Sequence, residues 1–266
     1  MKRRGAAVYD LKQMLSVIRW KRVINLARLW ITWLKARYFK RITIKGVPAF
    51  ASVEPTTSCN LGCPECPSGT GSFSRPTGRI DCENYKAVVD KLAPGLWWLN
   101  LYFQGEPMLH SRIIDMVRYA REKGIYTALS TNGHFLTDET CKGMINAGLN
   151  RIIISFDGLD QQSYQQYRRG GDIEQVKAGI LRLQYWKNMM KRQNPYTILQ
   201  TLILKSNAHQ AEAVKRWWKE SGTDELQFKK AQFYDFEQGN PLMPDDETKR
   251  RYVDDGSGHF SIKGKL

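Results

Sequence analysis

The sequence predicts an α/β fold, a partial (β/α)6 TIM-like barrel with an N-terminal helical extension. Segments with strand character and segments with helical periodicity alternate from Phe50 onward. Each of the six predicted strands is separated from the next by at least one helix, which requires parallel pairing with right-handed crossovers. Only six such units fit, so we expect an open barrel rather than a closed one of eight units. The 266 residues, 42% of them apolar, suffice to bury one core of this size.

The elements of the predicted barrel follow one another in a regular order. The strands are expected at 51–54, 98–103, 126–130, 151–156, 197–204 and 225–229. The helices are expected at 82–91, 112–123, 138–146, 161–191 and 210–220. After Ala231 the alternation stops and turn-forming residues accumulate, which is typical of loops with little core. The predicted units are a helical extension at 1–46, a core barrel at 47–230 and an irregular C-terminal segment at 231–266.

The extension is strongly basic. It holds 13 Lys and Arg and one acidic residue, Asp10, a net charge of +12, whereas the other 220 residues carry 28 basic and 25 acidic residues, a net charge of +3. Two apolar stripes run along it, the first at Leu11, Met14, Leu15 and Ile18 and the second at Val23, Ala27, Trp30, Ile31 and Leu34. The five-residue step from Ile18 to Val23 breaks the periodicity, which predicts two short helices or one long kinked helix.

This extension has two interpretations. In the first, residues 9–38 make a peripheral contact with an anionic membrane, with Trp20, Trp30 and Trp33 at the lipid boundary. In the second, which is the default because basic amphipathic patterns are common, the stripe packs on the main domain and the charges face water. We expect a cytoplasmic protein, because no signal peptide or membrane-spanning segment is predicted, with membrane-peripheral attachment as the alternative. No nucleic-acid partner is expected, because the main domain shows no basic face with interleaved aromatic residues.

The strongest chemical signal is a C-x3-C-x2-C loop after the first strand. Its cysteines are Cys59, Cys63 and Cys66. Three closely spaced thiolates suit a [4Fe–4S] cluster with one iron left open, and an open position distinguishes a catalytic metal centre from a structural one. The alternative is a zinc site completed by Cys82 or a His, although zinc ribbons usually carry a second C-x2-C pair and this sequence has none.

Polar motifs also follow three further strands of the predicted barrel. They are Gln104-Gly105-Glu106-Pro107, Ser130-Thr131-Asn132-Gly133 and Ser155-Phe156-Asp157-Gly158. Each alone is explained by turn formation or helix capping. The carboxyl ends of parallel barrel strands converge on one face, however, so these groups and the cysteine loop should line one mouth. Together they predict a catalytic site.

The cysteine loop and these motifs resemble those of the radical S-adenosylmethionine (SAM) superfamily, over roughly residues 50 to 230. The resemblance implies a [4Fe–4S] cluster on the three cysteines. It also implies that Gly105, Glu106 and Pro107 bind the amino group of the SAM methionine, and that the later motifs approach SAM or its ribose through Ser130, Asn132, Ser155 and Asp157. Arg168 is a candidate partner of the SAM carboxylate, although an Arg-Arg pair before a Gly-Gly turn is more often solvated. Gln200, on the fifth strand, is a candidate neighbour of the adenine.

The activity implied by the resemblance is reductive cleavage of SAM to a 5′-deoxyadenosyl radical, which abstracts hydrogen from a substrate. That substrate is expected to be a peptide or protein side chain, and the electron donor a flavodoxin or ferredoxin. The alternative is a catalytically incomplete iron–sulfur protein that binds a partner or senses redox state.

Two departures from the family pattern stand out. Glu65 occupies a position before the third cysteine that is often aromatic, so the adenine pocket must differ there. The motifs look most like those of SPASM-type proteins, whose C-terminal domain is rich in cysteine, yet no cysteine follows Cys141. We therefore expect one cluster, and a chain that lacks that domain or is truncated before it. Cys82 and Cys141 are expected to be buried helical thiols.

Overall fold

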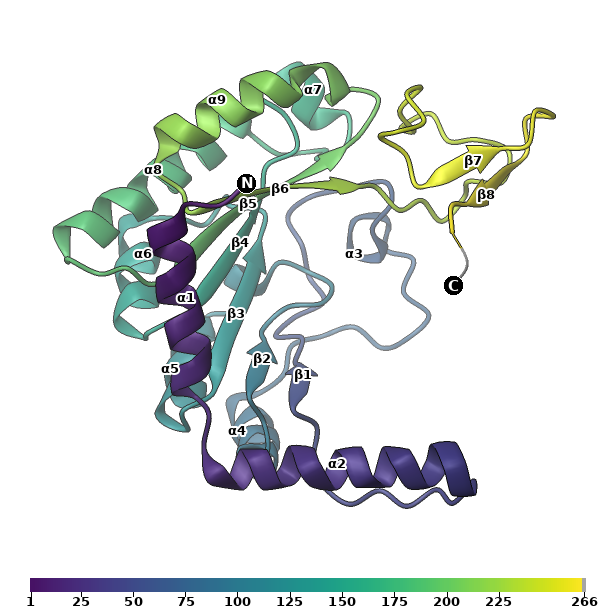
Figure 1. Ribbon diagram of the computed structural model, residues 1–266. Helices are drawn as coiled ribbons and strands as arrows, with labels where there is room; N and C mark the ends of the chain where they lie inside the picture. Colours follow the sequence, from purple (N-terminus) through teal and green to yellow (C-terminus); the bar gives the residue numbers. More distant parts are fainter. Residues whose placement is uncertain (265–266) are drawn as a thin grey trace.

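The computed structural model describes residues 1–264 and contains a six-stranded parallel sheet (Figure 1). The strands are β1 (Phe50–Ser52), β2 (Trp98–Asn100), β3 (Tyr126–Thr131), β4 (Arg151–Ser155), β5 (Tyr196–Ile203) and β6 (Glu225–Lys230). Each strand pairs in parallel with the next one along the chain, so sheet order equals chain order. β1 and β6 form the two edges, and the barrel is open between them. The predicted fold class is confirmed.

Helices pack against the sheet and enclose the main hydrophobic core (Figure 1). The longer ones are α4 (Cys82–Leu92), α5 (Ile113–Glu122), α6 (Asp138–Asn146), α8 (Ile173–Met189) and α9 (Ala211–Ser221). The shorter ones are α3 (Pro67–Thr70), η1 (Pro107–Leu109), α7 (Gln161–Gln165) and η2 (Ala208–Gln210). The core joins apolar strand residues such as Leu99 and Ile152 to helix residues such as Val117 and Ile180, all of them completely buried.

The predicted helix at 161–191 is two helices. α7 ends before the Gly170-Gly171 pair, where Gly170 adopts a left-handed φ of 80°. α8 starts afresh at Asp172, whose carboxylate accepts hydrogen bonds from the backbone N–H groups of Glu174 and Gln175. The interruption places the intervening segment, which includes Arg168, over the mouth of the barrel instead of on its outer wall.

β2 ends at Asn100, three residues before the predicted end of the strand at 103. Beyond it the chain turns to meet the segment that follows β1. The backbone N–H of Gln104 donates to Glu54 Oε1 at 2.8 Å, and that of Glu106 donates to the Ser58 carbonyl at 2.8 Å. These contacts replace the sheet pairing of a longer strand and fix the second motif beside the cysteine loop.

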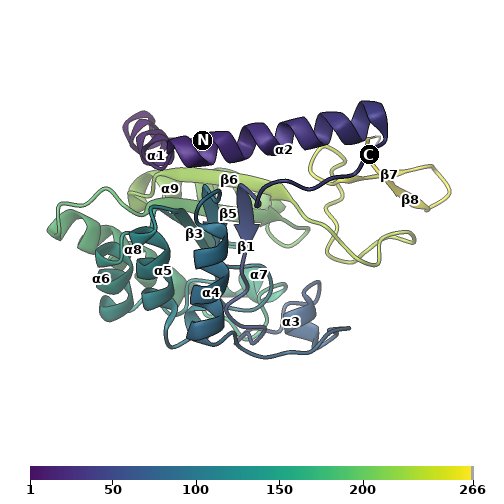
Figure 2. The same ribbon diagram turned by 90° about the horizontal axis from the view of Figure 1, so that it is seen from below.

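The N-terminal extension consists of two helices, α1 (Arg4–Ser16) and α2 (Trp20–Phe39), as the broken periodicity predicts. α1 lies along the amino-terminal ends of the strands, where the Met1 amino group donates to the Leu226 carbonyl at 2.8 Å and Asp10 contacts Tyr126 and Arg151. Both helices lie on the same side of the molecule (Figure 2).

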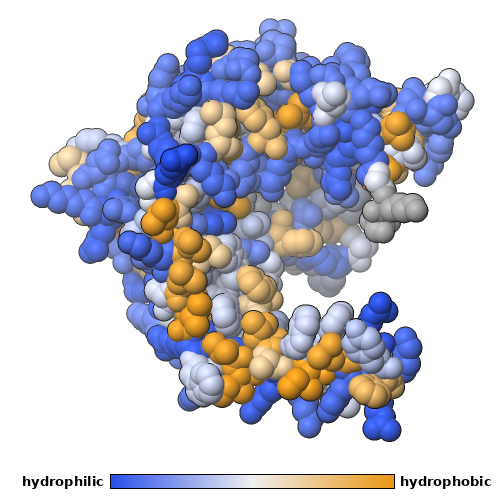
Figure 3. Space-filling view, viewed as in Figure 1, coloured by the Kyte–Doolittle hydropathy of each residue, from blue (hydrophilic) through white to orange (hydrophobic). Residues whose placement is uncertain are grey.

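The default interpretation of the extension is wrong in one respect. Most apolar side chains of α1 and α2 do not pack on the main domain but form an exposed band (Figure 3), although Met14 and Leu34 are half-buried. The buried residues of the two helices are polar instead, namely Asp10, Arg22 and Asn25. Within residues 1–264, no helix combines the length and the apolar character needed to cross a bilayer.

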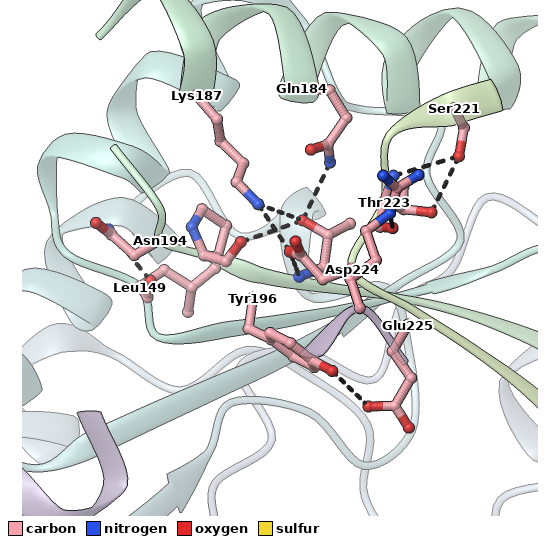
Figure 4. Close-up of polar contacts among 12 residues, drawn as sticks. Leu149, Gln184, Lys187, Asn194, Tyr196, Ser221, Thr223, Asp224 and Glu225 are labelled. Atoms are coloured by element: carbon pink, nitrogen blue, oxygen red, sulfur yellow. Dashed lines mark hydrogen bonds and ion pairs between the residues drawn. The ribbon is translucent and has the colours of Figure 1, made fainter. Parts of the chain in front are cut away.

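A buried polar network closes the amino-terminal end of the sheet near β5 and β6 (Figure 4). Lys187 of α8 donates to Asp224 Oδ2 at 2.8 Å, and the Thr197 backbone N–H donates to the same oxygen at 2.8 Å. The Tyr196 hydroxyl donates to Glu225 at 2.9 Å. Burial lowers the pKa of Lys187, and the Asp224 carboxylate opposes that shift. This network lies at the end of the barrel opposite the motifs, where polar contacts typically serve stability.

The C-terminal segment has more structure than predicted. It contains an antiparallel hairpin of β7 (Tyr252–Asp254) and β8 (Phe260–Ile262), and Phe233 and Tyr252 are buried in a second core that includes Leu61 and Cys63. Glu65 ties the segment to the cysteine loop by accepting hydrogen bonds from the Tyr234 backbone N–H and the Asn240 side chain, both at 2.9 Å. The segment therefore packs against the cysteine loop.

Candidate active site

The three cysteines of the loop lie between β1 and α3. Cys63 is buried, whereas Cys59 and Cys66 are partly exposed. The loop is held by hydrogen bonds from the Cys66 backbone N–H to the Cys63 carbonyl at 3.2 Å and from the Gly62 N–H to the Arg169 carbonyl at 2.9 Å. Burial raises the pKa of Cys59 and of Cys63. A bound metal would counter that shift, because thiols lose their proton on coordination.

A cavity of about 150 Å³ brings the cysteines together with residues from the other strand ends. It is lined by Cys59, Leu61, Cys63, Cys66, Phe103, Gln104, Gly105, Glu106, Ser130, Thr131, Asn132, Ser155 and Arg168. Nine of the twelve predicted site residues are in this set. The other three, Pro107, Asp157 and Gln200, lie outside the lining. Four separate strand ends therefore meet at one mouth, as the parallel topology requires.

Glu106 is 2% exposed and its carboxylate is fully engaged with the protein. Oε1 accepts hydrogen bonds from the Thr131 hydroxyl at 2.7 Å and the Met108 N–H at 3.1 Å, and Oε2 accepts one from the Asn132 N–H at 2.7 Å. The side chain therefore holds the end of β3 in place. Pro107 is buried at the start of η1 and supports this turn from outside the cavity.

Glu106 should make stability pH-dependent. Burial raises the pKa of its carboxyl from 4.5 to about 7. Because the folded carboxyl holds its proton more tightly than the unfolded one, stability falls as pH rises from about 4.5 to about 7. The expected loss is about 3 kcal/mol of unfolding free energy. Urea unfolding of cluster-free protein at several pH values should show this slope, and Glu106→Gln should flatten it; a variant that keeps the wild-type slope would contradict the assignment.

Gly105 occupies a conformation that other residues avoid. Its φ is 75°, and a Cβ added to it would lie 2.2 Å from the Thr56 carbonyl oxygen. Its N–H donates to the Ser68 hydroxyl at 2.7 Å. The glycine thus lets the second motif approach both the segment before Cys59 and the one after Cys66.

Asn132 connects the end of β3 to the cysteine loop. Its amide Nδ2 donates to Asn60 Oδ1 at 2.7 Å and lies 4.0 Å from Cys59 Sγ. Its Oδ1 accepts a hydrogen bond from the His134 backbone N–H at 3.1 Å. Hydrogen bonds to both its nitrogen and its oxygen therefore fix the orientation of the Asn132 amide. Ser130 also lines the cavity.

Arg168 and Asp157 form an ion pair at the mouth. Arg168 Nε and Nη2 each lie 2.6 Å from Asp157 Oδ2, and Nη1 donates to Cys63 Sγ at 3.7 Å. Asp157 is completely buried and accepts a further hydrogen bond from the Leu202 N–H at 2.6 Å. Burial lowers the pKa of Arg168, but Asp157 and Cys63 outweigh it and raise that pKa well above its usual value. Arg168 is not the solvated residue that an Arg-Arg pair usually is, and Asp157 orients it from behind.

Gln200 lies beside the cavity on β5. It pairs in register with Ser155 of β4, which lines the cavity. The Oε1 atom of Gln200 is buried and has no hydrogen-bond partner within residues 1–264. A buried acceptor without a partner is costly, so this atom fits a ligand that supplies a donor.

Sequence reasoning missed Gln104, Thr131 and Asn60 as site residues. Gln104 Oε1 accepts a hydrogen bond from Cys66 Sγ at 3.4 Å, and Thr131 and Asn60 make the contacts given above. The signal in the sequence is position, because each of the three is directly adjacent to a predicted site residue. Phe103, also missed, lines the cavity although it is largely exposed.

The donor set at this cavity fits an iron–sulfur cluster. The lining contains three cysteines, no fourth cysteine and no histidine, and Cys82 at the start of α4 is not among them. No three or more His, Cys, Asp or Glu side chains within residues 1–264 are arranged around a single metal position. A [4Fe–4S] cluster takes Cys thiolates as ligands and distributes them over several iron atoms, which suits three cysteines that do not surround one position.

The Radical SAM superfamily model matches residues 53–185, half of the chain. Among curated proteins, the AdoMet-dependent heme synthase of Methanosarcina barkeri is 29% identical over 140 residues, which cover 52% of this chain and 40% of that protein. The PqqA peptide cyclase of Bradyrhizobium diazoefficiens is 26% identical over 202 residues, which cover 75% of this chain and 51% of that protein. The chain thus spans about half or less of the length of these relatives.

Solved structures share the fold. Streptococcus suis SuiB bound to S-adenosylmethionine superposes with a TM-score of 0.62 at 12% identity, covering 82% of this chain and 47% of that one. Native anSMEcpe with bound AdoMet gives a TM-score of 0.58 at 19% identity, covering 70% of this chain and 52% of that one. The superfamily uses a [4Fe–4S] cluster and SAM, and the cysteine loop lies within the matched residues. The chain belongs to the radical SAM superfamily.

Proposed function

We propose that this cavity is the catalytic centre of a radical SAM enzyme that acts on a peptide or protein side chain. Cys59, Cys63 and Cys66 would hold a [4Fe–4S] cluster, with SAM beside it. When bound, these cofactors supply a 5′-deoxyadenosyl radical that abstracts hydrogen from the substrate. The observation that carries the proposal is that the three thiols share one cavity with polar groups from three other strand ends.

Arg168 would bind the carboxylate of SAM. Asp157 fixes its Nε and Nη2, while its Nη1 lies against Cys63 at the cavity. The same positive charge stabilises the Cys63 thiolate, because the guanidinium opposes the effect of burial on the pKa of that thiol. Arg168 thus serves both the cluster loop and the anionic end of SAM.

The amino group of SAM needs hydrogen-bond acceptors. The Glu106 carboxylate already accepts three hydrogen bonds from the protein, so backbone carbonyls of the Gly105 segment are the better candidates. Ser130, Asn132 and Ser155 would contribute hydrogen bonds to the nucleoside. Gln200 would add the acceptor that has no partner within the described residues.

The decisive experiment is reductive cleavage of SAM. Anaerobically reconstituted protein, reduced with dithionite, should convert SAM to 5′-deoxyadenosine, and Cys63→Ala should not. Cys82→Ala is the matched control, because that cysteine does not line the cavity and should leave the conversion unchanged. A wild-type protein that carries the cluster but forms no 5′-deoxyadenosine would instead support the alternative, an iron–sulfur protein that binds a partner or senses redox state.

Two similar proteins favour a peptide substrate. One is the PqqA peptide cyclase, and the other is SuiB, which has been solved bound to the precursor peptide SuiA and superposes with a TM-score of 0.61. A GTP 3′,8-cyclase of Limosilactobacillus fermentum is also similar, at 33% identity over 135 residues. A candidate peptide and GTP should therefore be added in parallel assays. If the substrate is a peptide, the peptide should increase 5′-deoxyadenosine formation and GTP should not. We propose a flavodoxin or ferredoxin as the one-electron donor.

A further inference from the structure

The N-terminal helices attach to the barrel through polar side chains. Asp10 of α1 contacts Tyr126 and Arg151. Arg22 of α2 is 2% exposed, and its Nη1 donates to the Val17 and Gly124 carbonyls at 2.7 and 2.6 Å. Its Nη2 donates to the carbonyls of Ala93 and Lys123. The inner side of both helices is therefore polar, which reverses the usual arrangement of a helix on a globular domain.

The outer side of the same helices is apolar. We call this surface the N-terminal face. Its exposed members are Val8, Leu11, Leu15, Ile18, Trp20, Val23, Leu26, Trp30, Ile31 and Trp33. Leu15 and Trp30 expose 54% and 60% of their surface, and Trp20 exposes 75%. The apolar band runs along α1 and continues onto α2 without a break (Figure 3).

The two helices present this band in one direction. They lie on the same side of the molecule, along the top of Figure 2, with the sheet and the other helices below them. On α2 the face includes a trough of about 650 Å³ lined by Val23, Leu26, Ala27, Leu29, Trp30 and Trp33. Contiguous exposed apolar surface of this kind marks an interaction site on a soluble domain.

The face is flanked by positive charge, and the exposed Asp90 that lies beside Trp20 and Lys21 is paired with Lys123. Eleven exposed Lys and Arg of the first 46 residues make no ion pair within residues 1–264; they are Arg3, Arg4, Lys12, Arg19, Lys21, Arg28, Lys35, Arg37, Lys40, Arg41 and Lys45. Lys21, Arg28 and Lys35 are spaced by seven residues and so line one flank of α2. The only acidic residue of this region, Asp10, is buried against Arg151.

We propose that the N-terminal face binds an anionic lipid surface, with α1 and α2 lying in the interface. A bilayer covers the apolar band, accommodates Trp rings at its boundary and attracts the surrounding cations, which accounts for all three features. A second copy of the chain fits less well, because a two-fold contact through this face would bring the two sets of cations together. The proposal is independent of the chemistry at the cysteine loop.

Vesicle sedimentation of the full chain tests the proposal. The protein should pellet with vesicles of equal parts phosphatidylglycerol and phosphatidylcholine, and bind at least about tenfold more weakly to phosphatidylcholine alone. The double variant Trp30→Ser/Ile31→Ser should lose most of the vesicle binding, because it removes two apolar side chains of the N-terminal face. The triple variant Lys21→Gln/Arg28→Gln/Lys35→Gln should weaken binding to the anionic vesicles only.

A control variant on α8 tests whether removing exposed apolar side chains elsewhere on the protein also weakens vesicle binding. Leu181 and Tyr185 expose 50% and 53% of their surface, similar to Ile31 and Trp30 at 50% and 60%. Leu181→Ser/Tyr185→Ser should bind vesicles as the wild type does, and circular dichroism should show all variants folded. The proposal is overturned if the wild type binds neither vesicle, if the α8 variant loses binding equally, or if light scattering shows a dimer that Trp30→Ser/Ile31→Ser dissociates.

Discussion

Replacing Gly105 with alanine should abolish cluster loading and 5′-deoxyadenosine formation together. The new Cβ would lie 2.2 Å from the Thr56 carbonyl oxygen and 2.9 Å from the Ser58 oxygen, distances that no real Cβ tolerates. Both obstacles are backbone atoms, so no side-chain rotation relieves the overlap. The φ of 75° adds the usual penalty of a left-handed conformation. We expect a cost of at least about 3 kcal/mol, expressed as displacement of the segment that leads into Cys59.

Gly71→Ala is the matched control for this substitution. Gly71 also has a positive φ, of 71°, and lies at the end of α3 near the same loop, but a Cβ there would meet no atom within 4 Å. This variant should lose only about 1 kcal/mol and should load iron normally. Iron analysis after anaerobic reconstitution, with thermal unfolding of the cluster-free proteins, distinguishes the two. Equal behaviour of both variants would show that the φ penalty, not the overlap, decides the outcome.

The sequence predicts the barrel elements well because neighbouring residues determine where each helix begins and ends. α6 spans 138–146 as expected, since Thr137 accepts from the Thr140 N–H in a capping box and Gly148 follows the last turn with a φ of 76°. The convergence of the motifs is likewise predictable, because parallel strands present their carboxyl ends on one face. What this rule leaves open is which residues of a motif reach the cavity: Ser155 does, while Asp157 turns behind Arg168.

Periodicity does not predict which side of the N-terminal helices faces the barrel. It identifies the apolar side of α1 and α2 correctly, but the side that faces the barrel depends on partners distant in the sequence. Arg22 finds carbonyls at Lys123 and Gly124, and Asp10 finds Tyr126 and Arg151. These polar contacts, rather than apolar burial, fix the orientation of the helices.

The order in the C-terminal segment also depends on contacts with residues distant in the sequence. Its strands are short and its turns rich in Gly and Asp, so no periodic pattern marks it. Its core is formed with the cysteine loop, through Phe233 and Tyr252 against Leu61 and Cys63. Glu65, a departure from the family pattern, has a physical role here because its carboxylate holds Tyr234 and Asn240 of this segment.

Replacing Arg168 with alanine should reduce both stability and cluster loading. The change would leave the Asp157 carboxylate, which is completely buried, without its counter-ion. Breaking a buried pair in this way costs about 3–5 kcal/mol. It would also remove the charge that lowers the pKa of Cys63, so burial and the Asp157 charge would raise that pKa further. The thiol would then release its proton only at higher pH, and iron loading should become weak at neutral pH and recover as pH increases.

Two further variants separate the loss of charge from the loss of packing at this site. Arg169→Ala removes an exposed neighbouring arginine and should change neither stability nor loading. Asp157→Asn/Arg168→Met removes both charges, so it should recover much of the stability that Arg168→Ala loses. Because that double variant lacks the guanidinium, SAM binding measured by equilibrium dialysis should stay weak although the protein is stable again. If the double variant binds SAM as the wild type does, Arg168 has no part in holding the SAM carboxylate and serves only to neutralise Asp157.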